Sequence, residues 1–343
     1  MNEMKGTLLL FTLMFALPLL LAAAYCRLRK SKVLHIRQDY VRDPRYFGNS
    51  FRRMVQQALP ADAEGVLHLS RPEQCVFPED AGALAEPAVD GLVLALKGEF
   101  RPEKPHVYNK EIYCAQDASL PAGSRFRALC GHRIALARDC QCLRWVDGSE
   151  AVTVGEDCDL GLSASSGKLL TLGCRTGFQR LYAPEIRLAM APEGLPPHSP
   201  VPVPEKRNMP VLYDLRNLSE RQSDSRGHVS ASLITRWNLR ILEGMTVEGD
   251  ISGDRGVRVM KNALVYGNVF AGEDVLLEEG ARVLGNVFSQ GSVRLGPGAS
   301  VGQPGEIHSV IARKKIYFAG DNRVYGFVSA LRGGTTGDRG DRR

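Results

Sequence analysis

The C-terminal third of this chain repeats itself with a period of 18, and this period limits the fold more than any other feature. Residues 243–260 (EGMTVEGDISGDRGVRVM), 261–278 (KNALVYGNVFAGEDVLLE) and 279–296 (EGARVLGNVFSQGSVRLG) align without a gap. The most regular columns are Val247, Val265 and Val283, then Gly249, Gly267 and Gly285, then Val257, Val275 and Val293. Asn268 and Asn286 share a column directly after the glycines.

The register extends in both directions. Stepping back by one period predicts apolar residues at four positions, which hold Val229, Leu233, Leu239 and Ile241. Stepping forward, the pattern takes an insertion and returns as Val324-Tyr325-Gly326-Phe327-Val328. About five repeats therefore span residues 227–330.

Short alternating apolar runs predict strands, and Gly or Asn predicts the tight corners between them. A short repeat cannot bury its own apolar face and must stack on its neighbours. One period divides into three faces of roughly equal length, so we expect an all-β fold, a three-sided parallel β-helix. A β-propeller needs about 40 residues per repeat and is excluded.

The middle of the chain, residues 107–190, has the same texture and is predicted to be a more degenerate β-helix. The spacing from Cys114 to Cys130 is the same as that from Cys142 to Cys158 and from Cys158 to Cys174. Coils of about 16 residues would stack these thiols as a buried ladder. A metal site around Cys140-Gln141-Cys142 and disulfide bonds are the alternatives, although the spacing does not match the usual Cys-x2-Cys pair.

The N-terminal residues 6–25 (GTLLLFTLMFALPLLLAAAY) carry no charge and have the length of a membrane-spanning helix. Basic residues follow immediately, at Arg27, Arg29, Lys30 and Lys32, without an acidic residue before position 38. The positive-inside bias then predicts a single-pass anchor in the cytoplasmic membrane with the body in the cytoplasm. A cleaved signal peptide, which would export the body, is the alternative.

Net charge and the proline-rich stretch complete the predicted domain organisation. The formal charge of +6 is too mild for a dedicated nucleic-acid binder. Residues 191–210 hold seven prolines and predict an extended linker. The expected segments are an anchor (1–26), a juxtamembrane and irregular region (27–106), the degenerate β-helix (107–190), a Pro-rich linker (191–226), the regular β-helix (227–330) and a disordered tail (331–343).

Catalytic motifs are not evident: there is no P-loop, G-x-S-x-G or H-E-x-x-H. We therefore predict no catalytic, cofactor-binding or metal residue, and no cofactor. His308 is the residue to test against this prediction, because it lies in the insertion and β-helix acyltransferases often use a His as general base. The sequence around it lacks the sustained hexapeptide pattern of those enzymes.

The runs LEGMTVEGDI and VYGNVFAGEDVLLEEGARVLGNVFSQGSVRLGPGASV resemble the bactofilins, bacterial polymer-forming cytoskeletal proteins. The resemblance covers residues 227–330 well and 107–190 weakly. It implies a β-helix that polymerises end to end without nucleotide, attached to the inner face of the membrane, as a scaffold for envelope or polarity proteins. It implies no catalytic residue. The long N-terminal region, the anchor and the second β-helical segment depart from the family, and an extra domain could cap one end of the stack.

These observations predict a membrane-anchored scaffold that self-associates through the open ends of its β-helix, where strand edges invite another subunit. The residues expected at these ends are Leu233, Leu239, Ile241, Val324 and Val328. The expected partners are the chain itself and the membrane, with envelope or polarity proteins as further candidates and no nucleic acid. An acyltransferase-like enzyme acting on an envelope precursor and an exported binding module are the alternative functions.

Overall fold

The structure is a computed structural model that describes residues 17, 43–59, 66–68, 72–78, 84–188, 201–202, 209–213 and 227–337. Contacts divide the chain into two units, Met1–Asp43 and Pro44–Arg343, and the helix and strands named below belong to the second. Apart from Leu17, the expected membrane span lies outside the described residues, as do Arg27, Arg29, Lys30 and Lys32. Within the part of the chain that is described, no helix is both long enough and apolar enough to cross a bilayer.

The second unit is a β-solenoid of about 13 turns, and 52% of the described residues lie in strands. In the C-terminal part, three parallel ladders run side by side. The first contains β13 (His228–Val229), β16 (Thr246–Val247), β19 (Leu264–Val265), β22 (Arg282–Val283) and β25 (Ser300–Val301). The second contains β14 (Ser232–Thr235), β17 (Ile251–Gly253), β20 (Val269–Ala271), β23 (Val287–Ser289) and β26 (His308–Ala312). The third contains β15 (Leu239–Ile241), β18 (Val257–Val259), β21 (Val275–Leu277), β24 (Val293–Leu295) and β27 (Ile316–Phe318).

The predicted register of the repeat is confirmed, because Val247 pairs with Val265 and Val265 with Val283. These valines are fully buried and form one apolar column of the core. The glycine column is required by close stacking: a Cβ added to Gly267 would lie 2.4 Å from the carbonyl oxygen of Gly249. Any side chain there would push neighbouring coils apart.

The asparagine column forms a hydrogen-bonded ladder at the next corner. The Asn286 Nδ2 donates to Asn268 Oδ1 at 2.8 Å, and Asn268 Nδ2 donates to Asp250 Oδ1 at 2.9 Å. The ladder continues past the insertion, where the Ser309 backbone N–H donates to Asn286 Oδ1 at 2.8 Å. The side chains of this column thus accept hydrogen bonds from backbone N–H groups at the corners, which are not paired within the strands.

The middle part is a second run of parallel coils. Its strands are β5 (Val107–Cys114), β6 (Ala118–Leu120), β7 (Arg125–Leu136), β8 (Gln141–Val154), β9 (Ser163–Ser166), β10 (Leu169–Leu172) and β11 (Gly177–Leu188). Its coil length varies: Val107 pairs with Arg125, whereas Arg125 pairs with Gln141, so the second of these coils is shorter than the first. Irregularities in the strand pairing absorb the difference, which explains the degenerate sequence.

The predicted thiol ladder is wrong for most of its members. Cys130 pairs with Tyr113, and Cys142 pairs with Phe126. Cys140 and Cys158 instead hold equivalent positions in adjacent coils, each next to a residue of the Gln141–Asp159 bridge. No disulfide bond joins two of the described cysteines, and the described residues contain no group of three potential metal ligands.

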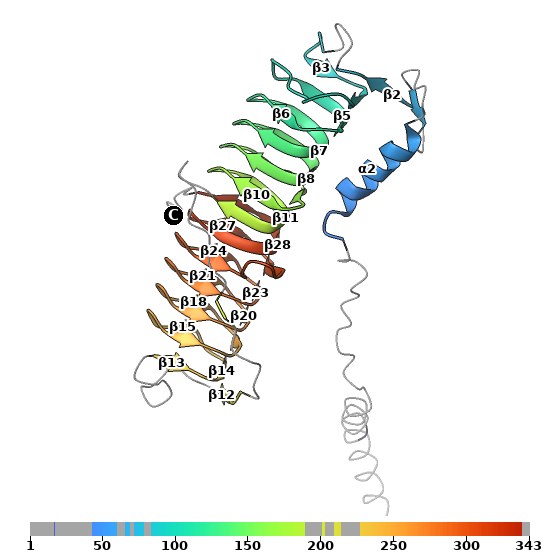
Figure 1. Ribbon diagram of the computed structural model, residues 1–343. Helices are drawn as coiled ribbons and strands as arrows, with labels where there is room; N and C mark the ends of the chain where they lie inside the picture. Colours follow the sequence, from blue (N-terminus) through green and yellow to red (C-terminus); the bar gives the residue numbers. More distant parts are fainter. Residues whose placement is uncertain are drawn as a thin grey trace, which may run out of the picture. The chain divides into compact units, whose positions relative to one another are not determined.

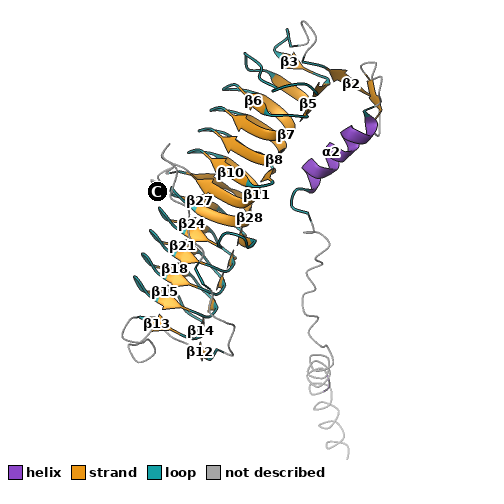
Figure 2. Ribbon diagram, viewed as in Figure 1, coloured by secondary structure: helices purple, strands orange, loops and turns teal. Residues whose placement is uncertain are grey.

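The solenoid also begins earlier than predicted. Two strands, β3 (Ala88–Val89) and β4 (Leu92–Ala95), already pair in parallel with β5. Strand β2 (Pro72–Val76) stacks on β4, and β1 (Val66–His68) pairs antiparallel with β2. The helix α2 (Tyr46–Ala58) buries Gly48, Phe51 and Val55, which lie three and four positions apart on one face. Figure 2 shows this helix beside the strand-built coils.

The two runs of coils meet at their C-terminal ends. Strand β28 (Arg323–Thr336) pairs with β25, β26 and β27 on one edge and antiparallel with β11 on the other. Figure 1 shows β11 and β28 side by side at the junction. Part of the predicted disordered tail is therefore strand, because residues to Thr336 are paired with neighbouring coils. The predicted linker likewise contains β12 (Val211–Tyr213), which pairs with β14.

Candidate functional site

The first coil of the C-terminal run, residues 227–241, presents strand edges. Among the described residues, β13 pairs only with β16, and β15 pairs only with β18. The Leu239 N–H donates to the Gly256 carbonyl, toward β18. Because peptide groups alternate in direction along a strand, those of Arg240 point away from β18, toward the outer edge. This edge can accept another strand.

The residues predicted for this end are located there, but their side chains point inward. Leu233, Leu239 and Ile241 are 0%, 1% and 0% exposed. Strand β12 covers part of the end, since Leu212 pairs with Leu233. Any association here would therefore use backbone edges and exposed residues such as Ile234, rather than the three predicted side chains.

The expectation that Val324 and Val328 lie at an open end is corrected by the junction. Val328 pairs with Leu181, and Val324 pairs with Ile186. The junction is fixed further by the Thr336 hydroxyl, which donates to the Gly173 carbonyl at 2.6 Å and accepts the Thr176 N–H at 2.9 Å. The chain's own middle part therefore occupies the end that a second subunit was expected to use.

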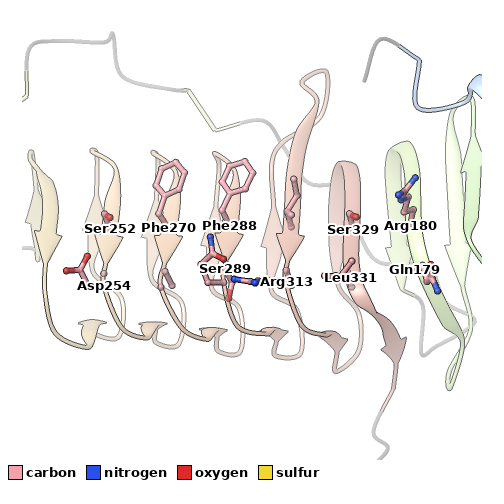
Figure 3. A pocket seen from close by; sticks show the side chains of 17 residues that line it. Gln179, Arg180, Ser252, Asp254, Phe270, Phe288, Ser289, Arg313, Ser329 and Leu331 are labelled. Atoms are coloured by element: carbon pink, nitrogen blue, oxygen red, sulfur yellow. The ribbon is translucent and has the colours of Figure 1, made fainter. Parts of the chain in front are cut away.

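A groove runs along the second ladder from β17 to β11, with a volume of about 610 Å³ (Figure 3). One wall is a column of outward-facing residues in register: Ser252, Phe270, Phe288, Ile311 and Ser329. Small residues including Gly253, Ala271 and Ala312 line it beside this column. The groove thus follows the coil stack across several strands.

The groove combines an apolar stripe with separated charges. The rings of Phe270 and Phe288 stack with centroids 5.3 Å apart and an interplanar angle of 6°. Arg180 lies at one end, Asp254 lies at the other, and Arg313 lies between them beside Ser289 (Figure 3). None of these three forms a salt bridge with another described residue. Stacked rings and flanking charges suit binding of an extended chain, and no nucleophile with an adjacent base is present among the lining residues.

His308 has a partner that the sequence did not reveal. Its Nε2 lies 3.0 Å from Glu306 Oε2, and Gln303 Nε2 donates to the other Glu306 oxygen at 3.3 Å. Its Nδ1 is enclosed and makes no hydrogen bond with a described residue. One ring nitrogen is therefore occupied and the other is closed to solvent, which does not favour a general base.

A buried aspartate that sequence reasoning missed holds α2 on the coils. Asp147 is 1% exposed and receives the Arg45 guanidinium in a two-bond fork, at 2.9 Å for each bond. Arg52 Nη2 donates to Asp147 Oδ2 at 3.0 Å, and the Ser165 hydroxyl donates to Oδ1 at 2.7 Å. Gly48 allows this approach, because a Cβ there would lie 2.2 Å from the Asp147 carboxyl carbon.

Burial raises the pKa values of two thiols far above the usual value for cysteine. Burial raises the pKa of Cys130 to about 12, against a partial lowering by Arg52, and burial also raises the pKa of Cys142 to about 12. These groups stay protonated and act as small apolar side chains.

Comparisons with protein-family models, with curated proteins and with solved structures yield no match to this chain.

Proposed function

We propose that this protein is a membrane-anchored, self-assembling scaffold of the bacterial cell envelope or cytoskeleton, polymerising through the outer ends of its coil stack without nucleotide. The supporting observation is the coil at residues 227–241, whose strands β13 and β15 are paired on one edge only within the described residues. Open strand edges recruit further strands, and end-to-end contacts that do not close into a ring give filaments.

The junction between β11 and β28 supports the same mechanism. It joins two coil runs end to end through antiparallel backbone pairing, with apolar side chains buried on the inner face. The chain thus contains one example of the kind of contact that assembly requires. Because this junction uses the C-terminal ends of both runs, the outer ends left for assembly are the coil at 227–241 and the N-terminal end of the middle run, where β2 already covers the edge of β4.

The proposed family is the bactofilins, on the sequence resemblance of residues 227–330. A three-sided parallel β-helix agrees with this assignment. The proposed location is the cytoplasmic membrane, through residues 6–25 with Arg27, Arg29, Lys30 and Lys32 on the cytoplasmic side. In this proposal the protein is not an enzyme, and it needs no cofactor.

The test removes one hydrogen-bond donor from the open edge of β15. Arg240→Pro removes an N–H that points to the outer edge while leaving the Leu239 bond to β18 intact, and proline is tolerated on edge strands. Arg240→Ala, which keeps the N–H, is the matched control. We expect Arg240→Pro to prevent assembly and Arg240→Ala to assemble as wild type. Equal assembly of the two variants would contradict the proposed edge contact.

A further inference from the structure

An apolar patch on α2 lies on the side of the helix next to its docked face. Tyr46, Phe47 and Met54 are 58%, 50% and 40% exposed, although all three are large and apolar or aromatic. Phe47 and Met54 are seven positions apart, so they share one face of the helix. Large exposed apolar groups gathered in this way indicate an interaction surface rather than chance exposure.

A hollow of about 260 Å³ lies beneath the patch. Phe51, Leu92 and Trp145 contribute to its lining, and Phe51 and Trp145 meet edge to face with centroids 5.5 Å apart. Lys110, Glu111 and Arg144 line it as well. Arg127 and Arg144 pair with Glu111 at 3.2 Å and 3.9 Å, so the one acidic residue of the lining is already balanced by basic side chains.

We propose that this patch rests on the surface of an anionic lipid bilayer. Aromatic and apolar side chains beside basic ones are the composition of helices that lie in the membrane interface. The helix contains Arg52 and Arg53 and no acidic residue. Of these two, Arg53 is exposed and able to reach lipid headgroups, whereas Arg52 is engaged with Asp147.

The position of α2 in the chain favours lipid over a protein partner. The helix begins at Tyr46, and the proposed anchor ends at Tyr25. Fully extended, the segment between them reaches at most about 75 Å, so an anchor in the bilayer would keep the helix within that distance of the membrane. The segment itself contains Arg27, Arg29, Lys30 and Lys32, which add to the attraction toward anionic headgroups. This inference rests on the anchoring part of the proposed function and not on self-association.

The chain's two tryptophans provide the test. Trp145 lines the hollow, whereas Trp237 lies on the C-terminal coils near Arg255. The full chain is reconstituted in vesicles of phosphatidylglycerol and phosphatidylcholine that carry bromine near the headgroup. Trp237→Phe leaves Trp145 as the reporter, and Trp145→Phe leaves Trp237 as its control. We expect quenching of Trp145 well above that of Trp237.

The patch is then removed without touching the docked face. Phe47→Ser with Met54→Ser should reduce Trp145 quenching to the level of Trp237, while the amides of α2 keep their hydrogen-exchange protection. Arg53→Glu should reduce quenching on anionic vesicles but not on pure phosphatidylcholine. Two results would overturn the proposal. One is equal quenching of Trp145 and Trp237 when the patch is intact. The other is strong quenching of Trp145 that persists in the variant with Phe47→Ser and Met54→Ser. Flotation of the same samples tests the anchor, and sedimentation tests self-association, so each failure is distinguishable.

Discussion

Leu181 and Val328 lie opposite each other across an antiparallel strand pair, and neither side chain is exposed to solvent. They are distant in the chain, yet they join the last coils of two β-helical runs. This contact makes one continuous sheet from segments that the sequence presents as separate repeats. It also places the C-terminal coil inside the stack rather than at an end.

Truncating one side of this junction should destabilise the whole body. Leu181→Ala removes a fully buried side chain between two packed coils, and we expect a loss of about 2–5 kcal/mol in the free energy of unfolding. Leu143→Ala, at a side chain that is 74% exposed, is the control and should change stability by less than about 0.5 kcal/mol. Denaturant unfolding followed by circular dichroism measures both. Equal midpoints for the two variants would show that the junction does not form.

The ion pairs of Asp147 with Arg45 and Arg52, called the aspartate clamp below, should control the docking of α2. Asp147→Asn keeps the shape of the side chain but removes the charge that Arg45 and Arg52 share at this position. Because both arginines remain partly exposed, we expect the free energy of unfolding to fall by about 3 kcal/mol, the low end for a broken buried ion pair. Hydrogen exchange of the α2 amides should accelerate.

Glu111→Gln is the control for the clamp, since Glu111 pairs with Arg127 and Arg144 at the surface. Such pairs contribute about 1 kcal/mol or less. Unchanged protection of α2 in Asp147→Asn would mean that apolar packing of Phe51 and Val55 suffices to hold the helix.

Buried thiols predict a loss of stability in alkali. The pKa values of Cys130 and Cys142 are raised from 9.0 to about 12 by burial. Above pH 9 the unfolded chain releases these protons and the folded chain retains them, so the folded state loses stability as pH rises toward 12. The slope is at most about 1.4 kcal/mol per pH unit for each thiol.

Unfolding midpoints between pH 8 and pH 10 measure this effect. The variant with Cys130→Ala and Cys142→Ala should be less stable at pH 8, because it leaves small cavities, but its stability should fall less steeply with pH. Parallel pH profiles for wild type and the variant would refute the assignment of this dependence to the two thiols.

Sequence periodicity predicted the regular coils well. The valine column of Val247 predicts buried core positions, and the glycine column of Gly249 predicts tight corners. Both predictions work because each position of a coil has the same environment in every stacked coil. In the middle part the same reasoning succeeded for the fold and failed for the cysteines. Coils there vary in length, so an equal spacing of thiols does not mean that they stack.

The contacts that position the candidate sites were beyond sequence reasoning. Nothing periodic links Leu181 to Val328, because the junction pairs the last strands of two separate runs in antiparallel directions. The ion pairs that hold α2 on the coils converge on one residue, Asp147. In the sequence it is only one polar residue within a strand, and nothing near it indicates that it binds two arginines. The Phe270 and Phe288 stack could have been noticed, since each directly follows a valine of the same column.

Sedimentation velocity of the full-length chain in detergent, without nucleotide, tests the central claim most directly. If the outer coil ends drive assembly, wild type and Arg240→Ala should sediment as assemblies that grow with concentration, and Arg240→Pro should sediment as a monomer. A wild-type chain that remains monomeric at every concentration, or an Arg240→Pro variant that assembles like wild type, would contradict the account.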